Sequence, residues 1–311
     1  MRYAYSASRR TCYSTVRSWA AAAETNPSKP SRRQYCPSLP TFPCHPMAIM
    51  RHLNLHRFSS LSNALRQCPN TTPWAPAPIS LIHHSSESLF HVAIDVSDHP
   101  DLINSHAWPG QYLQLRLPHA LKPVFLAIAS PPSLSASTGE FEFLVKSVTG
   151  STAEALCRLR RGDVVELSSV MGRGFDMEEI SPPEVYPTVL IFATGSGVSP
   201  IRSLIESGFG ADRRSDVRLY YGAKNLRRMA YQDRFKGWES SGVRIIPVLS
   251  QPDSGWQGER GYVQAAFARA KQISNPLGTG VVVCGCRQMA EEVTSILVAD
   301  GVSREKILKN F

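Results

Sequence analysis

Acidic residues are nearly absent from the first 86 positions of this 311-residue chain. That segment holds ten Lys or Arg and one acidic residue, Glu24, whereas residues 87–311 hold 24 residues of each sign. The whole net charge of +9 therefore lies in the first part of the chain. A nucleic-acid-binding domain carries its basic patch on folded structure, so a neutral remainder argues against a nucleic acid as partner.

Cysteine and long apolar runs are also scarce. Four of the seven cysteines lie in the first 86 residues, which leaves Cys157, Cys284 and Cys286. Three thiols are too few for a disulfide scaffold or for the four thiolates of an iron–sulfur cluster, so any such electron carrier must be another molecule. No stretch approaches the ~18 consecutive apolar residues of a membrane span. The sequence therefore predicts no metal cluster and no membrane span.

The amino-terminal segment has the composition of an organelle transit peptide. It is rich in Ser, Arg, Pro and Ala and nearly free of acid. We predict that residues 1–75 form this leader, with Met47 as an alternative start because apolar residues repeat at helical spacing after it. A disordered basic tail is the other interpretation.

Short strands dominate the residues that follow a proline-rich segment at 69–80. Stretches such as "EFEFLVKSV" at 140–148 are rich in β-branched and aromatic residues, and most are bounded by Pro, Gly or Ser. One helix, which begins at Ser151 and stops at Gly162, interrupts them. We predict a small antiparallel β-barrel over residues 76–180.

The pattern changes after a second proline-rich segment at 178–187. Four apolar strands alternate there with helical stretches, which begin near Pro200, Val263 and Gln288 among others. This alternation is typical of a parallel sheet with crossover helices. We predict an α/β domain over residues 187–311.

The stretch "IFATGSGVSP", residues 191–200, ends a buried strand at a glycine turn. Ser199 suits the N-cap and Pro200 the first position of a following helix. Such a turn presents unpaired N–H groups and a positive helix end to one space, which suits a phosphate. A β-branched residue at Gly197 is then expected to block the phosphate and abolish nucleotide binding. A plain tight turn is the alternative.

A second predicted strand end leads into the glycine-rich loop "VLSQPDSGWQGERGYVQ", residues 248–264. Ser250 and Arg260 suit a phosphate there, and Tyr262 suits stacking on a base. Ligands of parallel α/β sheets bind at the carboxyl ends of the strands, where this loop begins. A solvated loop is the alternative.

A third strand end carries Cys284-Gly-Cys286. Either thiol can contact the ring of a ligand at the carboxyl edge of the sheet. A metal site is less favoured, because no further cluster of Cys or His accompanies the pair.

The order and spacing of these segments resemble the ferredoxin-NADP reductase superfamily over residues 79–311. The resemblance rests on a barrel followed by an α/β domain with Gly-x-Gly-x-x-Pro, Tyr-Gly-Ala-Lys, Gly-Tyr-Val-Gln and a late Cys-Gly. "IFATGSG", "SPIRSLIESGF" and the terminal "KILKNF" are similar to a plant plastid branch, which implies a chloroplast location, with the mitochondrion as the alternative. In the superfamily the barrel binds FAD and the α/β domain binds NAD(P)H. The resemblance therefore implies an NAD(P)H-dependent flavoprotein oxidoreductase that passes hydride to FAD and electrons to an external acceptor, such as a small redox protein.

The resemblance also implies which residues face the nicotinamide nucleotide. Those that would face its pyrophosphate and ribose are Thr194, Gly195, Ser196, Gly197 and Pro200. Those that would hold a 2′-phosphate and the adenine are Ser250, Arg260, Tyr262 and Gln264. Cys284 would line the nicotinamide site, and the terminal Phe311 would cover the flavin ring or pack between the domains. Gln251 stands where NADP-specific reductases have Arg, so NADPH and NADH both stay open.

The flavin side departs from the superfamily pattern, which reads Arg-x-Tyr-Ser before Ile-Ala-Ser. Alignment of the latter places Val124 at the Arg position, Leu126 at the Tyr position and Ala127 at the Ser position, and Lys122 and Phe125 substitute in part. A second flavin element, Gly-Ser-Thr at a helix N-terminus, is kept. The flavin contacts implied are Phe125, Ala127, Ile128, Ala129, Ser130, Gly150, Ser151 and Thr152.

Two alternatives to the reductase stay open, and the altered motif favours the first of them. One is a nucleotide-binding or scaffold protein on the same fold that has lost flavin, because fold does not fix function. The other is an electron-transfer subunit of a larger complex, which would show a large exposed apolar patch on the barrel.

Overall fold

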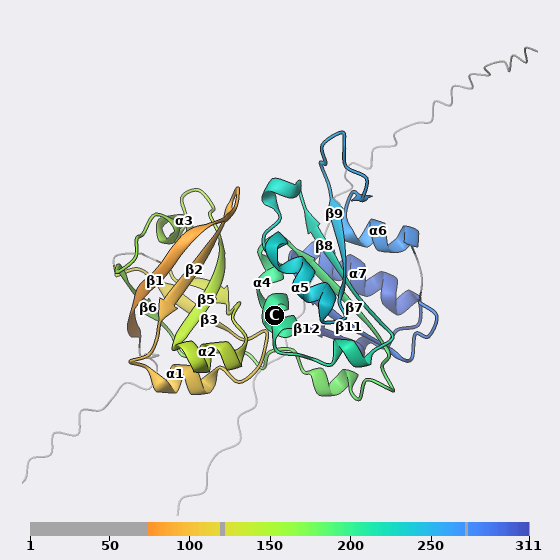
Figure 1. Cartoon of the computed structure of the whole chain (residues 1–311), viewed down its shortest axis with the longest axis horizontal. Helices are drawn as coiled ribbons and strands as arrows, with labels where there is room; N and C mark the ends of the chain where they lie inside the picture. Colours follow the sequence, from red (N-terminus) through yellow and green to blue (C-terminus); the bar gives the residue numbers. More distant parts are fainter. Residues whose placement is uncertain (1–73, 119–121, 271–272, 311) are drawn as a thin grey trace, which may run out of the picture. The chain divides into compact units, whose positions relative to one another are not determined.

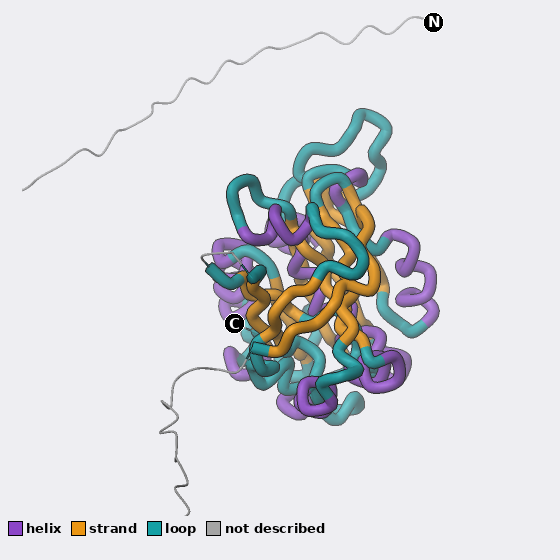
Figure 2. Tube along the Cα trace, turned by 90° about the vertical axis from the view of Figure 1, so that its left-hand side faces the viewer, coloured by secondary structure: helices purple, strands orange, loops and turns teal. Residues whose placement is uncertain are grey.

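The computed structural model describes residues 74–118, 122–270 and 273–310, so Phe311 and all of the predicted leader except Trp74 and Ala75 lie outside the described residues. The described chain forms two six-stranded sheets, one after the other in the sequence (Figure 1). In the view of Figure 2 the strands run through the middle and most helices lie around them.

The first sheet is an antiparallel barrel, in the order β4-β3-β6-β1-β2-β5. Its strands are β1 (Ala75–Ser86), β2 (Leu89–Asp95), β3 (Tyr112–Arg116), β4 (Val124–Ala127), β5 (Glu140–Lys146) and β6 (Val164–Leu167). A β-bridge between Ile128 and Phe143 joins the two edge strands, and the Ala129 N–H donates to the Glu142 carbonyl at 2.7 Å. These bonds close the sheet, which confirms the predicted antiparallel barrel.

Strand β1 begins inside the segment that was predicted to be a proline-rich entry to the domain. Pro76 and Pro78 belong to this strand, where they lie opposite residues of β6. Pairing of β1 with β2 begins only at Ile79. The two prolines therefore lie where one side of the strand is free, which is where a strand tolerates a residue without an N–H.

Three helices, not one, belong to this part of the chain: α1 (Pro100–Ser105), α2 (Pro132–Thr138) and α3 (Thr152–Cys157). The predicted helix is α3, and Ser151 caps it by accepting a hydrogen bond from the Glu154 N–H at 3.2 Å. The prediction of a single helix is wrong because α1 and α2 are one to two turns long and begin with Pro, a pattern that also suits a loop.

The second sheet is parallel throughout, in the order β10-β9-β8-β7-β11-β12, which confirms the predicted α/β fold. Its strands are β7 (Thr188–Thr194), β8 (Asp216–Ala223), β9 (Arg244–Leu249), β10 (Glu259–Arg260), β11 (Thr279–Cys284) and β12 (Ile307–Lys309). From β7 the order runs outward through β8 to β10, and the chain then returns to place β11 on the other side of β7. The order of the sheet therefore reverses between β7 and β11.

Helices cover both faces of this sheet. The side chains of α4 (Val198–Glu206) and α5 (Phe235–Ser240) pack in one apolar cluster with Ile191 of β7. Those of α6 (Val263–Ala270) and α7 (Arg287–Ala299) pack in another with Phe192 of the same strand. Because successive residues of a strand point to opposite faces, β7 is buried on both.

Helix α4 starts earlier than the sequence predicts. Its N-cap is Gly197 and its first residue is Val198, because the glycine turn is itself a short 3₁₀ turn that leads directly into the helix. Ser199 therefore does not cap the helix. Its hydroxyl instead donates to the Ala127 carbonyl of β4 at 3.2 Å.

Two histidines are buried in the barrel, and we expect its stability to depend on pH through them. His91 and His106 are 8% and 3% exposed, and burial lowers the pKa of each to about 4. An unfolded histidine has a pKa near ~6.5, so the unfolded chain binds more protons than the folded one between pH 6.5 and 4. We expect the free energy of unfolding to fall as the pH drops through this window, by about 2 kcal/mol per histidine at pH 5.

Urea unfolding at pH 7.5 and pH 5 measures this effect. His106→Gln should reduce the difference between the two pH values, whereas His84→Gln, at an exposed position of β1, should leave it unchanged. If the free energy of unfolding differs between pH 7.5 and pH 5 by the same amount in the parent and in His106→Gln, His106 is not a source of the pH dependence.

Candidate functional site

The glycine turn after β7 lies against the end of β11, at the point where the strand order reverses. The Cys286 N–H donates to the Thr194 hydroxyl at 3.3 Å. A Cβ at Gly197 would lie 2.5 Å from the Cys284 carbonyl oxygen, so a glycine is required for the two strand ends to approach this closely. Gly195 has a φ of +54° and open space where a Cβ would be, so this backbone faces solvent.

A large cleft of about 1440 Å³ lies between these turns and the barrel. Its walls are residues 122–127, 144–146, 148, 150–153, 155, 194–197, 199–200 and 284–286. The structure thus brings together the following predicted site residues: Phe125, Ala127, Gly150, Ser151, Thr152, Thr194, Gly195, Ser196, Gly197, Pro200 and Cys284. They come from β4, from the start of α3 and from the carboxyl ends of the neighbouring strands β7 and β11.

Strand β4 turns an aromatic ring toward this cleft. Phe125 is 60% exposed, whereas Val124 and Leu126 pack in the barrel core. The motif alignment places Leu126 at the position of the stacking aromatic. Because side chains alternate along a strand, the residue on the cleft side is Phe125 instead.

Three predicted flavin contacts do not line the large cleft. Ile128, Ala129 and Ser130 are fully buried. The first two close the barrel, and the Ser130 carbonyl accepts a hydrogen bond from the Ser203 hydroxyl of α4 at 2.9 Å. These three residues thus serve the closure of the barrel and the attachment of α4 to it.

The start of α3 already has internal partners. The Gly150 N–H donates to the Glu154 carboxylate at 2.7 Å, and the Thr152 hydroxyl donates to the Lys122 carbonyl at 2.7 Å. A phosphate at this turn would compete with the Glu154 carboxylate. Lys122 and Lys146 line the same cleft and can offset an anionic ligand.

A small cleft of about 530 Å³ continues from the large one. Both are lined by Lys146, Thr194, Gly195 and Cys286, so the two clefts meet at the glycine turn. The predicted nucleotide residues that line the small cleft are Ser250, Tyr262 and Gln264, besides the shared Thr194 and Gly195. The Tyr262 side chain is largely exposed and available for stacking.

Arg260 is the predicted phosphate ligand that does not line the small cleft. Its guanidinium donates to the Trp256 carbonyl at 2.6 Å, and it borders a separate hollow with Arg269. Strand β10, which the sequence does not predict, holds Arg260 beside β9 and accounts for this direction.

Four charged residues of the small cleft were not predicted as ligands: Lys146, Lys224, Arg228 and Glu292. Lys224 belongs to the Tyr-Gly-Ala-Lys motif, and this motif could have indicated from the sequence that Lys224 lines the cleft. Arg228 pairs with Glu87 at 2.8 Å. The Glu292 carboxylate is held by the side-chain amides of Gln264 and Gln288, at 2.7 and 2.8 Å. No sequence pattern indicated that Glu292 faces a ligand, because it lies in the second turn of α7.

Cys284 is buried in the wall of the large cleft, and burial raises the pKa of its thiol to about 12. The thiol donates to the Asn310 side chain at 3.3 Å, and Asn310 donates to the Gly110 carbonyl of the barrel at 3.3 Å. A protonated, buried thiol suits packing against a ligand ring better than nucleophilic attack. Cys286 is exposed, and the predicted role of Phe311 falls outside the described residues.

No three His, Cys, Asp or Glu side chains in the described part of the chain cluster as a metal site would require. None of the helices described is both long and apolar enough to cross a bilayer.

A closed antiparallel barrel, a doubly wound parallel sheet and clefts that meet at the switch point together define a two-domain fold of the reductase type. Residues 191–295 match the family model of the oxidoreductase NAD-binding domain. The chain is 52% identical over 278 residues to the fruit protein pKIWI502 of Actinidia deliciosa, and the match covers 85% of this chain and 88% of that protein. It is 29% identical to ferredoxin–NADP reductase B of Sorangium cellulosum, over 64% of this chain and 82% of that one.

Solved structures show the same fold. A ferredoxin NADP⁺ reductase from Neisseria gonorrhoeae, with bound FAD and NADP, superimposes with a TM-score of 0.61 at 17% identity, over 76% of this chain and 99% of that one. The cytochrome b5 reductase domain of Ulva prolifera nitrate reductase gives a TM-score of 0.61 at 18% identity, over 76% and 97%. The chain belongs to the ferredoxin-NADP reductase superfamily, together with the kiwifruit protein, as its motifs predicted.

Proposed function

We propose that this protein is an NAD(P)H-dependent flavoprotein oxidoreductase, with FAD in the large cleft and the nicotinamide nucleotide in the small one. The observation that carries the proposal is the meeting of the two clefts at Thr194, Gly195 and Cys286. FAD held in the large cleft would supply the group that accepts hydride from the nicotinamide and donates electrons to an acceptor. Residues 76–180 then form the FAD domain and residues 187–311 the nucleotide domain.

The residues of the large cleft fit a flavin nucleotide. Phe125 offers an exposed ring, Lys122 and Lys146 offer cations, and the backbone at Gly150 is open to a close approach. What the cleft lacks is a guanidinium on β4, so the pyrophosphate would be held by ammonium and backbone groups. The protein supplies geometry and electrostatics, and no side chain has to move a proton for hydride transfer.

In the small cleft we assign adenine stacking to Tyr262 and phosphate contacts to Ser250, Lys224 and the glycine turn. The acceptor is proposed to be an external redox protein, because a relative with 26% identity is named the electron transfer component of xylene/toluene monooxygenase. We propose that a transit peptide for the chloroplast lies within residues 1–73, because strand β1 begins at Ala75, and this location is in line with the plant relative.

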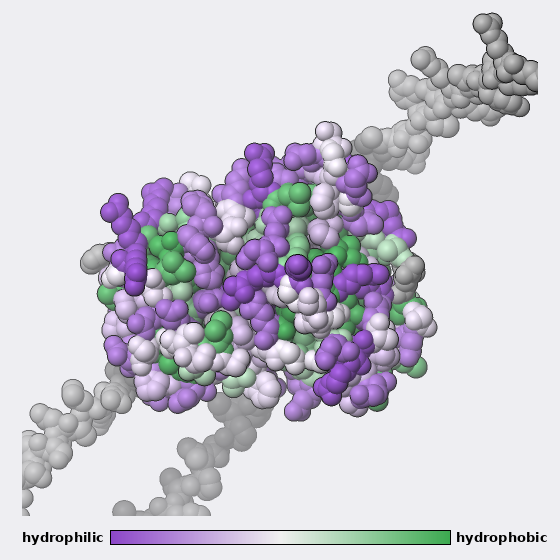
Figure 3. Space-filling model, viewed as in Figure 1, coloured by the Kyte–Doolittle hydropathy of each residue, from purple (hydrophilic) through white to green (hydrophobic). Residues whose placement is uncertain are grey.

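A protein on the same fold that has lost flavin is the second candidate function. The Glu154 carboxylate at the start of α3 and the missing guanidinium on β4 favour it. An electron-transfer subunit of a larger complex, the remaining alternative, predicts a large apolar patch on the barrel. On the face drawn in Figure 3, hydrophobic residues lie in separate patches among hydrophilic ones.

The deciding experiment is a visible absorption spectrum of the purified full chain, followed by addition of NADPH or NADH without air. A flavin band that bleaches supports the reductase and shows which nucleotide reacts. A colourless protein that gains no band when FAD is added overturns the reductase and supports the nucleotide-binding candidate.

Removal of the Glu292 carboxylate is expected to favour NADPH. A 2′-phosphate adds about two negative charges to the nucleotide, and a nearby carboxylate repels them. We expect Glu292→Gln to raise the ratio of kcat/KM for NADPH to that for NADH on the order of tenfold. Steady-state kinetics with both nucleotides measures the ratio.

Glu291→Gln is the matched control, because Glu291 is exposed, pairs with Arg287 and lines neither cleft. A ratio that moves equally in both variants would show a general charge effect. A ratio that moves in neither would place Glu292 away from the phosphate.

A further inference from the structure

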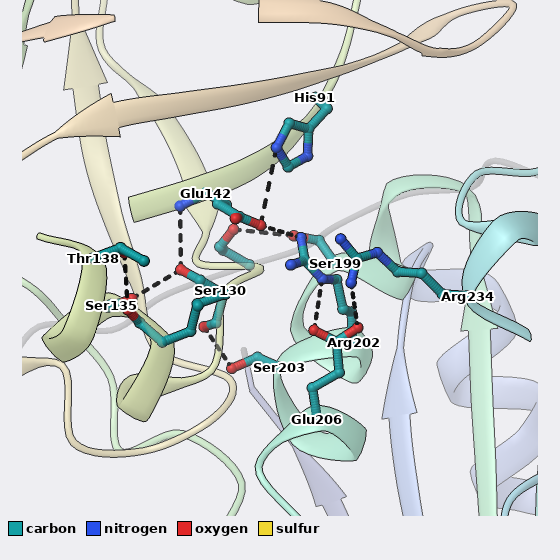
Figure 4. Close-up of polar contacts among 12 residues, drawn as sticks. His91, Ser130, Ser135, Thr138, Glu142, Ser199, Arg202, Ser203, Glu206 and Arg234 are labelled. Atoms are coloured by element: carbon teal, nitrogen blue, oxygen red, sulfur yellow. Dashed lines mark hydrogen bonds and ion pairs between the residues drawn. The ribbon is translucent and has the colours of Figure 1, made fainter. Parts of the chain in front are cut away.

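Helix α4 buries a polar stripe against the barrel. Ser199, Arg202, Ser203 and Glu206 follow at the spacing i, i+3, i+4 and i+7, so they share one face of the helix. Such a stripe ordinarily faces solvent, yet Arg202 is only 1% exposed and Ser203 is fully buried. Figure 4 shows Arg202 and Ser203 pointing toward Glu142 and Ser130 of the barrel, and Glu206 pointing toward Arg202 and Arg234.

Arg202 is paired with a carboxylate on each side. It forms an ion pair with Glu142 of β5 in the barrel and another with Glu206, one turn further along its own helix, at 3.0 Å. Glu206 in turn accepts from Arg234 at 3.0 Å and from the Trp238 indole at 3.1 Å. The guanidinium is therefore held between the barrel and the α/β domain.

Two hydroxyl groups of the same stripe bind the chain that follows β4. The Ser199 hydroxyl donates to the Ala127 carbonyl at 3.2 Å, and the Ser203 hydroxyl donates to the Ser130 carbonyl at 2.9 Å. Ala127 itself lines the large cleft. The stripe thus connects α4 to the strand that faces the proposed flavin.

A buried ion pair is weak evidence for stability, since the cost of removing the charges from water offsets much of their attraction. What a guanidinium adds is direction, because its fork bonds fix two partners at set angles. Helix α4 starts immediately after the glycine turn at 195–197. Any shift of α4 along the barrel would therefore move this turn relative to β4.

We propose that Arg202 is a positioning residue, whose bonds to Glu142 and Glu206 fix the glycine turn at a set distance from β4 and thereby the path of hydride transfer. The inference rests on the proposed function. In the step concerned, the nicotinamide gives up a hydride and is oxidised. The flavin accepts that hydride, with its hydrogen and its two electrons, and is reduced. Arg202 touches neither partner and acts through the position of α4.

The test compares the full-length parent with a triple variant, Arg202→Met with Glu142→Gln and Glu206→Gln, which leaves no carboxylate of the pair unpaired. We expect the single-turnover rate of flavin reduction to fall about 100-fold, because displacement by about 1 Å has that effect on a positioned reaction. The dissociation constant of the nucleotide should change less than about threefold. Arg202→Lys, with Glu142 and Glu206 intact, should recover part of the rate.

Arg287→Met is the matched control, because Arg287 also pairs with a Glu four residues further along its helix but is exposed. It should keep the parental rate. A folded triple variant whose reduction rate stays within threefold of the parent would overturn the proposal. So would a rate loss that is fully matched by weaker nucleotide binding.

A distance measurement separates this inference from the proposed function. Spin labels at Val164→Cys on β6 and Leu277→Cys in the α/β domain, both exposed, are placed in a background in which five native cysteines are replaced by Ser: Cys12, Cys36, Cys44, Cys68 and Cys286. We expect the distance distribution to broaden in the triple variant and to stay narrow with Arg287→Met. If the parent reduces no flavin, the proposed function fails, while an unchanged distribution would overturn the positioning role by itself.

Discussion

Replacement of Gly197 by Ala is expected to lower the free energy of unfolding by about 3 kcal/mol and to weaken nucleotide binding at least tenfold. The added Cβ would lie 2.5 Å from the Cys284 carbonyl oxygen and 2.8 Å from the Cα of Gly285. Both atoms belong to the backbone of a buried strand end, so neither can move aside cheaply. Relief of the clash requires the glycine turn to shift, and with it the N–H groups assigned to the nucleotide.

Two further glycines supply the comparison. Gly195→Ala has open space but a φ of +54°, so we expect a stability loss of only about 1 kcal/mol and an effect mainly on binding. Gly237→Ala lies in α5 with no atom near its Cβ, and should be neutral or stabilising by up to about 1 kcal/mol. Urea unfolding and calorimetric titration with NADPH and NADH measure both quantities. Equal unfolding midpoints for Gly197→Ala and Gly237→Ala would contradict the packing argument.

Truncation of Phe125 to Ala is expected to raise the dissociation constant of FAD between about fivefold and 100-fold, since stacking of an aromatic side chain on a ring contributes about 1–3 kcal/mol. The side chain is 60% exposed in the free cleft, so its loss leaves no cavity in the barrel core. The unfolding midpoint should therefore stay close to that of the parent. Fluorescence titration of the protein with FAD measures the affinity.

Trp108→Ala is the control for this variant, because Trp108 is an exposed aromatic of the barrel that lines neither cleft. It should bind FAD as the parent does. A similar loss of affinity in both variants would show a general effect of the barrel surface. Unchanged affinity in Phe125→Ala would remove Phe125 from the flavin site.

Local sequence patterns were sufficient to predict a feature that lies within one continuous segment. The apolar run that ends at Thr194 and the glycines after it predicted a strand and a turn, and the period change after 178–187 predicted the second sheet. Features that depend on a partner far away in the sequence could not be predicted in this way. Pro76 is tolerated in β1 only because β2 begins its pairing further along, and the side chain that β4 shows to the cleft depends on which face packs in the barrel.

The candidate site divides in the same way. Tyr262 and Ser250 lie in a glycine-rich loop at a strand end, and this local setting was enough to predict that they line a cleft. Arg260 has the same signal, yet its guanidinium is drawn to the Trp256 carbonyl because β10 pairs with β9. Arg202 and Glu142 are 60 residues apart in sequence, and nothing local to either indicates a partner.

The sequence by itself determined the two kinds of sheet, their order along the chain and the superfamily, because periodicity, glycine turns and motif spacing are properties of contiguous residues. Only the tertiary structure decided which strand ends meet, that the two clefts join at Gly195, and that a polar face of α4 is buried. These follow from the strand order around β7 and from packing between the sheet and the barrel. Such contacts form between residues far apart in the chain, where no single segment carries the signal.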